Sequence, residues 1–80
     1  MGITHKIGPF KFERSGGIFG GGDKVKVYKS GKEIDEFYLD DDTVYSIKLF
    51  RGNAGAQQNA FAIDCEKWFG KYGISLLGED

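Results

Sequence analysis

A glycine-rich segment near the N-terminal end limits the fold more than any other feature of this chain. Five of the eight residues from Ser15 to Gly22 are glycine, which disfavours both helix and strand because ordering glycine costs more backbone entropy than ordering other residues. Residues 24–28 follow it and alternate polar and apolar side chains, as a β-strand does. A phosphate-binding loop would instead lead into a helix. The segment therefore predicts a connection between two strands.

Alternating segments along the chain predict an antiparallel sheet of four to five strands. We expect strands at residues 10–14, 24–29, 32–39, 43–51 and 59–63. The pair Ser30-Gly31 between two of these segments is typical of a tight hairpin turn. Ile34 and Phe37 have opposite parity in the strand pattern, which predicts a β-bulge near residues 35–36. Residues 59–63 also fit the first turns of a helix, and we favour the strand.

The C-terminal third of the sequence predicts one short helix, at about residues 65–72. Asp64 suits the N-cap position, and Gly73 suits the position after the last helical residue. Four apolar side chains recur at the spacing of a buried helical stripe: Cys65, Trp68, Phe69 and Tyr72. We therefore expect a single α+β domain over residues 1–80, with this helix packed on one face of the sheet.

The composition argues against several classes of function. The chain carries 11 basic and 12 acidic residues in 80, whereas nucleic-acid-binding modules usually have a clear basic excess. One histidine and one cysteine offer no constellation for acid–base or nucleophilic catalysis, so we expect neither an enzyme nor a bound metal or cofactor. We expect Cys65 to be a core residue rather than a reactive thiol.

The same composition predicts where such a protein acts. A single cysteine excludes an internal disulfide and suits a reducing compartment. No apolar run approaches the roughly 18 residues of a membrane span. We therefore expect a cytoplasmic protein without membrane contact.

Two features form the candidate partner-binding site. Ile18 and Phe19 lie within the glycine-rich segment, where apolar side chains on a loop can anchor a partner. Asp40, Asp41 and Asp42 form an acidic turn that lacks the spacing of a calcium-binding loop, and an acidic surface suits a basic partner. The sequence therefore predicts a non-enzymatic module, monomeric or weakly homodimeric, that docks on a larger protein or nucleoprotein complex.

The small size and the lack of catalytic groups are also typical of inhibitors of host machinery that phages or mobile elements encode, anti-CRISPR proteins among them. This expectation comes from size alone, because no motif in the chain carries a family resemblance.

Nucleic-acid binding is the alternative function. Basic side chains and an aromatic residue on a sheet face can contact single-stranded nucleic acid. The hairpin over residues 24–32 would supply them: Lys24, Lys26, Tyr28, Lys29 and Lys32. The carboxylates that follow at residues 33–42 weaken this interpretation.

Overall fold

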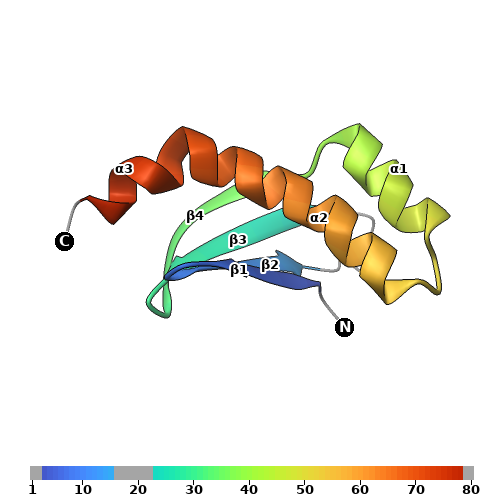
Figure 1. Cartoon of the computed structure of the whole chain (residues 1–80), viewed down its shortest axis with the longest axis horizontal. Coiled ribbons are helices and arrows are strands. Elements are labelled where there is room, and N and C mark those ends of the chain that lie inside the picture. The colour runs from blue at the N-terminus through green and yellow to red at the C-terminus, as the bar shows by residue number, and fades with distance from the viewer. Residues whose placement is uncertain (1–2, 16–22, 79–80) are drawn as a thin grey trace.

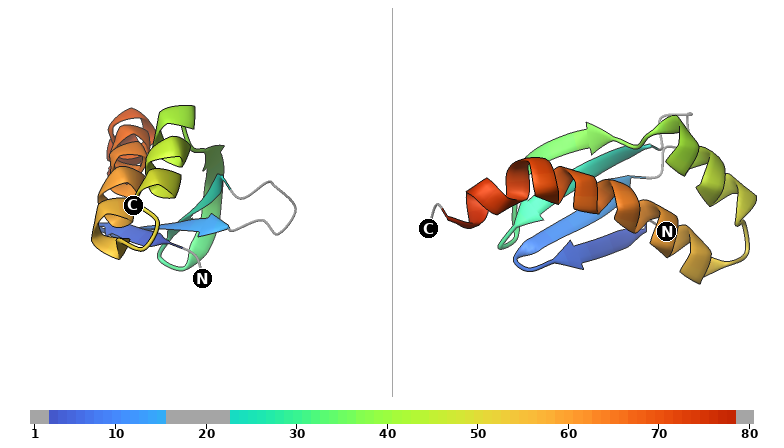
Figure 2. Two further views of the ribbon diagram at one scale, coloured as in Figure 1. Left: turned by 90° about the vertical axis from the view of Figure 1, so that its right-hand side faces the viewer. Right: turned by 45° about the horizontal axis from the view of Figure 1, so that its top comes forward.

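The computed structural model describes residues 3–15 and 23–78 and shows an α+β fold, as the sequence predicts (Figure 1). The sheet strands are β1 (Thr4–Ile7), β2 (Phe10–Ser15), β3 (Lys24–Lys29) and β4 (Lys32–Tyr38). The helices are α1 (Asp41–Leu49), α2 (Ala54–Trp68), the π-helix η1 (Phe69–Gly73) and α3 (Ile74–Leu77). All of them lie on one side of the sheet, and none of the described helices covers the other side, which we call the open face (Figure 2).

The sheet has the order β1-β2-β3-β4, and each strand pairs antiparallel with the next along the chain. The two-residue turn between β3 and β4 is confirmed. Ser30 and Gly31 have φ angles of 53° and 85°, which are the positive values that the favoured hairpin turns require. Strand β1 was not predicted, because only four residues at Thr4–Ile7 carry its pattern.

The expected bulge in β4 is present, one residue earlier than predicted. Val27 lies opposite Asp35, and the next residue, Tyr28, lies opposite Glu33. Ile34 is therefore the additional residue of β4. The bulge explains how β4 changes parity part-way along its length.

The prediction of a strand at residues 43–51 is wrong, because residues 43–49 belong to α1 and residues 50–51 form the turn after it. Thr43 and Ile47 are buried four residues apart, on one face of the helix. Tyr45 and Leu49, which suggested the strand face, are 67% and 63% exposed. The short segment fits both periodicities, and packing against α2 decides in favour of the helix.

The prediction of a strand at residues 59–63 is also wrong, because α2 runs through it. The N-cap of α2 is Asn53 and not Asp64, and the Asn53 side chain accepts a hydrogen bond from the backbone N–H of Ala56 at 3.1 Å. The alanines and glutamines after Asn53 favour helix. Asp64 lies in the middle of the helix and is buried.

The helix also continues past its predicted end at residue 72. Gly73 does not terminate it, and the chain passes through η1 into α3. A Cβ atom at Gly73 would lie 2.6 Å from Cδ1 of Phe69 and 3.2 Å from Cζ3 of Trp68. Glycine is therefore needed here for close packing.

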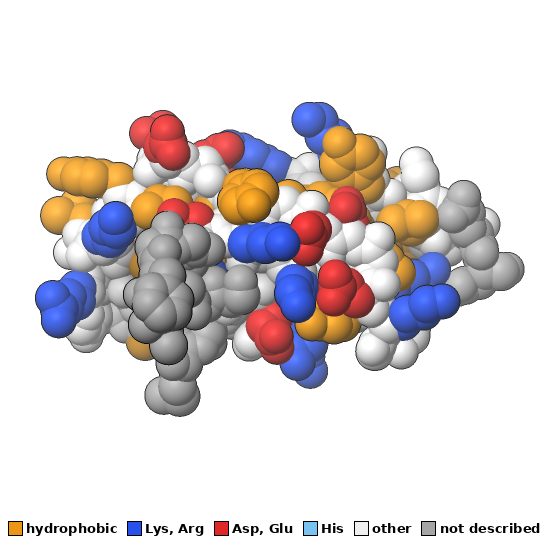
Figure 3. All heavy atoms as spheres, turned by 180° about the vertical axis from the view of Figure 1, so that it is seen from behind, with side chains coloured by type: hydrophobic (Ala, Val, Ile, Leu, Met, Phe, Trp, Pro, Cys, Tyr) orange, Lys and Arg blue, Asp and Glu red, His pale blue; other side chains and the backbone are white. Residues whose placement is uncertain are grey.

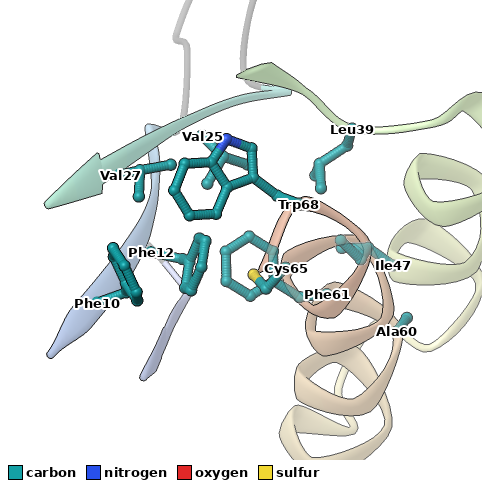
Figure 4. Close-up of a cluster of buried hydrophobic side chains, with 10 residues drawn as sticks. All are labelled: Phe10, Phe12, Val25, Val27, Leu39, Ile47, Ala60, Phe61, Cys65 and Trp68. Carbon is teal, nitrogen blue, oxygen red and sulfur yellow. The ribbon is translucent and has the colours of Figure 1, made fainter. Parts of the chain in front are cut away.

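The core lies between the sheet and α2 (Figure 4). Its buried members are Phe10, Phe12, Val25, Val27, Leu39, Ile47, Ala60, Phe61, Cys65 and Trp68. The Trp68 ring meets Phe10 and Phe12 edge-on, with centroids 5.5 and 5.6 Å apart, the geometry that aromatic pairs prefer. The predicted helical stripe is confirmed at Cys65 and Trp68, while Tyr72 is 50% exposed.

Candidate functional site: a groove beside strand β4

A groove lies between the end of β4 and the C-terminal part of α2 with η1. Its main hollow has a volume of about 560 Å³. A second hollow of about 300 Å³ adjoins it and shares Trp68, Lys71 and Tyr72 with it. We call the two hollows together the β4 groove. Its aromatic walls are Phe37, Tyr38, Trp68 and Tyr72, and its polar lining includes Asp40, Asp64, Lys67 and Lys71.

The groove follows an edge of the sheet, because β4 is the last strand in the order. The outer edge of such a strand presents main-chain hydrogen-bonding groups that the sheet does not use. Apolar side chains are exposed along it, with Tyr38 72% exposed and Ile34 38% exposed. Tyr72 of η1 is half exposed and lines the main hollow together with Tyr38 and the second hollow together with Ile34. The groove therefore combines exposed aromatic surface with an open strand edge.

Trp68 fixes the distance between the two sides of the groove. Its indole Nε1–H donates a hydrogen bond to Oδ2 of Asp35 on β4, at 2.8 Å. The π-helix begins at the next residue and carries Lys71 and Tyr72 along the groove. Such π-helical turns are rare in proteins, and those that occur are often found at functional sites. The hydrogen bond between Trp68 and Asp35 thus holds the two walls of the groove at a fixed distance.

Asp64 is the central polar residue of the groove and is only 5% exposed. Its Oδ2 accepts a hydrogen bond from the backbone N–H of Asp40 at 3.0 Å, which ties the start of α1 to α2. Its Oδ1 is buried without a hydrogen-bond partner among the described residues. The nearest cation, Lys67 Nζ, lies 3.9 Å from that oxygen, which is too long for a hydrogen bond.

Lys67 bonds to Asp40 instead. Its Nζ donates to Oδ2 of Asp40 at 3.1 Å. The hydrogen bond and the charge of Asp40 raise the pKa of Lys67, and the charges of Asp64 and Asp42 add to this. The Lys67 side chain is 66% exposed. The ion pair is therefore accessible to water and contributes little to stability.

The structure separates the three predicted aspartates. Asp40 is the N-cap of α1 and lines the groove, although its side chain makes no capping bond. Asp41 and Asp42 occupy the first turn of α1 and are exposed, where negative charge stabilises a helix through its dipole. Ile18 and Phe19, the other predicted pair, lie outside the described residues.

The five residues of the predicted nucleic-acid site are divided between the two faces of the sheet. Lys24, Lys26 and Tyr28 alternate with the buried residues of β3 and lie on the open face, where basic and acidic side chains interleave (Figure 3). Lys24 Nζ lies 2.9 Å from Glu36, and Lys26 Nζ lies 3.9 Å from Glu33.

The other two lysines lie on the side of the helices. Lys29 pairs with the buried Phe10 and donates from Nζ to the backbone oxygen of Leu76 at 3.0 Å. Lys32 pairs with Lys29 in the register of the hairpin. The hairpin therefore does not gather its basic groups on one surface.

Four residues of the groove were not predicted from the sequence as site residues: Tyr38, Asp64, Lys67 and Lys71. A usable signal existed within α2, where the buried positions are Ala60, Phe61, Asp64, Cys65 and Trp68. A carboxylate inside an apolar helical stripe is rare unless it has a partner or a function. The signal was hidden because Asp64 was interpreted as an N-cap.

Cys65 is fully buried, as expected for a core residue. Burial raises the pKa of its thiol from the ordinary 9.0 to about 12, and the negative charges of Asp64 and Glu66 add to the shift. In the unfolded chain the thiol loses its proton near pH 9, whereas the folded protein holds it up to about pH 12. Below pH 9 both states keep the proton, so the thiol makes folding neither more nor less favourable there.

We therefore expect Cys65 to lower the stability progressively as the pH rises from 9 towards 12. The measurement is the melting temperature across this range for the wild type and for Cys65→Ala, which removes the titrating group and leaves the other titrating residues. The melting temperature of the wild type should fall more steeply than that of the variant. Parallel curves would show that the thiol is not held neutral by the fold.

Among residues 3–15 and 23–78, no group of three or more His, Cys, Asp or Glu side chains is arranged to hold a metal ion. The same described residues form no helix with the length and apolar character of a membrane span. Comparisons of the chain with protein-family models, with curated protein sequences and with solved structures find no match.

Proposed function

We propose that this protein is a small protein-binding module and that the β4 groove is its docking surface. The observation that carries the proposal is the pair of exposed tyrosines, Tyr38 and Tyr72, around a hollow backed by the buried Trp68. Tyrosine and tryptophan are enriched in protein interfaces and dominate their binding energy. They do so because each buries a large area while losing few rotatable bonds.

The open edge of β4 supports a protein as the ligand. A segment of a partner chain can add main-chain hydrogen bonds to an edge strand while its side chains enter neighbouring pockets. The groove walls are already fixed by the Trp68–Asp35 hydrogen bond and by the bond from Asp40 to Asp64. Little ordering is then required on binding, which favours affinity.

We propose further that docking inhibits the partner and takes place in the cytosol. A small domain without catalytic groups can inhibit a larger protein by covering one of its surfaces.

Nucleic-acid binding through the Lys24–Lys32 hairpin gains no support from the contacts of the open face. Glu36 and Glu33 stand beside Lys24 and Lys26 there, and they reduce the positive field that phosphates require.

The test compares partner capture by the wild type and by a Tyr38→Ala/Tyr72→Ala double variant. Proteins that the tagged wild type retains from a lysate are identified by mass spectrometry, and the affinity of each purified candidate is then measured for every variant. Because anchoring tyrosines often contribute about 2 kcal/mol each, we expect the double variant to bind more than about tenfold more weakly. Tyr45→Ala is the matched control, since Tyr45 is 67% exposed but lies on α1 away from the groove.

Equal affinity of the double variant and the wild type would contradict the proposal. Equal losses in the double variant and in Tyr45→Ala would also contradict it, because the effect would then not be specific to the groove. Thermal unfolding followed by circular dichroism confirms that each variant is folded.

A further inference from the structure

A buried carboxylate oxygen without a partner lies against the β4 groove. Asp64 lines the main hollow at 5% exposure, and its Oδ1 has no hydrogen-bond partner among the described residues. Such a group costs free energy in the absence of a donor. A ligand that donates a hydrogen bond to Asp64 Oδ1 would remove this cost.

From this we infer that the β4 groove accepts an arginine side chain of the partner protein, whose guanidinium donates to Asp64 and Asp40. The inference rests on the function proposed above and specifies the partner's chemistry at the same site. It also gives a defined role to Asp40, the one predicted acidic residue that the structure places in the groove.

The charges of the surrounding hollows favour a cation. Three carboxylates line the β4 groove, Asp35, Asp40 and Asp64, against two lysines, Lys67 and Lys71. The net charge of this lining is therefore negative. A basic side chain entering from a partner meets complementary charge.

Lys67 does not donate a hydrogen bond to Asp64 Oδ1. Its Nζ is 3.9 Å from Asp64 Oδ1 and bonds to Asp40. The side chain is 66% exposed, so it can turn into water at little cost when another cation arrives. We expect the guanidinium to displace it.

The aromatic walls favour arginine over lysine. Trp68, Tyr38 and Tyr72 line the same hollow as the carboxylates. A guanidinium stacks on aromatic faces and, being a planar fork, can donate to two carboxylates at once. An ammonium group can approach the same oxygens only as a point charge.

The test is a nuclear magnetic resonance titration of the full chain with the blocked peptide acetyl-Gly-Arg-Gly-amide. The control peptide contains citrulline, which has the same shape as arginine and no charge. We expect saturable shifts of the Trp68 indole N–H and of the Asp40 amide with the arginine peptide. The citrulline peptide should bind about tenfold more weakly, because its N–H donors carry no positive charge and hydrogen-bond a carboxylate more weakly than a guanidinium does.

Two substitutions of opposite effect sharpen the test. Asp64→Asn keeps an oxygen for the Asp40 N–H and removes the charge, so we expect affinity for the arginine peptide to fall about tenfold. Lys67→Gln removes the competing cation, so affinity should rise about threefold. Asp41→Asn is the control, since Asp41 is exposed on α1 and lines neither hollow of the β4 groove, and it should leave affinity unchanged. If Asp64→Asn fails to fold, the Lys67→Gln result alone still decides.

The inference is overturned if the Trp68 and Asp40 signals do not move, if citrulline binds as well as arginine, or if Lys67→Gln weakens binding. Loss of partner capture in the Tyr38→Ala/Tyr72→Ala variant, together with a silent arginine titration, would leave the docking groove standing and remove only its arginine ligand. Failure of both experiments would remove both.

Discussion

Replacing Phe12 by alanine is expected to lower the free energy of unfolding by about 3–5 kcal/mol, as is typical for a large aromatic removed from a core. The Phe12 side chain is fully buried, and its ring packs edge-on against Trp68 and Phe37 at 5.6 and 6.4 Å. Strands β2 and β3 and helix α2 meet around it, so the resulting cavity cannot close by a local shift. For a domain of this size, with about 4–12 kcal/mol of total stability, the loss is a large part of the whole.

Urea unfolding followed by circular dichroism measures this change. Ile63→Ala is the matched control, because Ile63 lies on α2 but is 55% exposed. A surface substitution of this kind should change the free energy of unfolding by no more than about 0.5 kcal/mol. Similar losses in both variants would show that Phe12 is not at the centre of the core.

The substitution Gly73→Ala is expected to cost about 1–3 kcal/mol, although alanine normally stabilises a helix relative to glycine. The added Cβ would meet Phe69 Cδ1 at 2.6 Å and Trp68 Cζ3 at 3.2 Å. Neither ring can easily retreat, because Phe69 packs against Phe10 and Trp68 bonds to Asp35. The clash would therefore also disturb the wall of the β4 groove.

Gly70→Ala gives the opposite sign and serves as the control. Gly70 lies in the same π-helix, and its Cβ would meet nothing within 4 Å among the described atoms. The ordinary helix preference then applies, and we expect stability to rise by up to about 1 kcal/mol. Thermal unfolding of the two variants distinguishes the packing explanation from a general demand for glycine in η1. Losses of equal size in both would contradict the packing explanation.

The sheet was largely predictable because its signals are local. Strand β3 carries strict alternation, and the turn after it contains Ser30 and Gly31, whose backbone angles suit a hairpin. The bulge in β4 was also visible, because Ile34 and Phe37 have opposite parity. Each of these features depends on residues within a few positions of one another.

The helices were harder to predict, since short amphipathic segments fit two periodicities. In α1 the residues Val44 to Leu49 alternate like a strand, and only the burial of Thr43 and Ile47 against α2 selects the helix. In α2 the expected strand at residues 59–63 and the expected helix from residue 65 both miss the start of the helix after Asn53. Tertiary packing, which the sequence pattern does not contain, decides both segments.

The candidate site was predictable only at Asp40. The β4 groove joins Asp35 and Tyr38 from the sheet to Asp64 and Trp68 from α2, across about 30 positions of sequence. No local motif links such residues. The site became visible only when the length of α2 was known, because that length places Asp64 inside the apolar face of the helix.

The neighbour-to-neighbour order of the strands has a consequence for how the chain acquires its structure. Each strand pairing closes a short loop, so the whole sheet can form from local hairpins at low entropic cost. Helix α2, in contrast, joins parts that are distant in the sequence, since Gln58 donates to the backbone oxygen of Thr4 across 54 positions. Docking of α2 on a formed sheet is then the slowest contact to find. The kinetic barrier of folding is therefore expected to lie at this step, and it would be reported by Trp68.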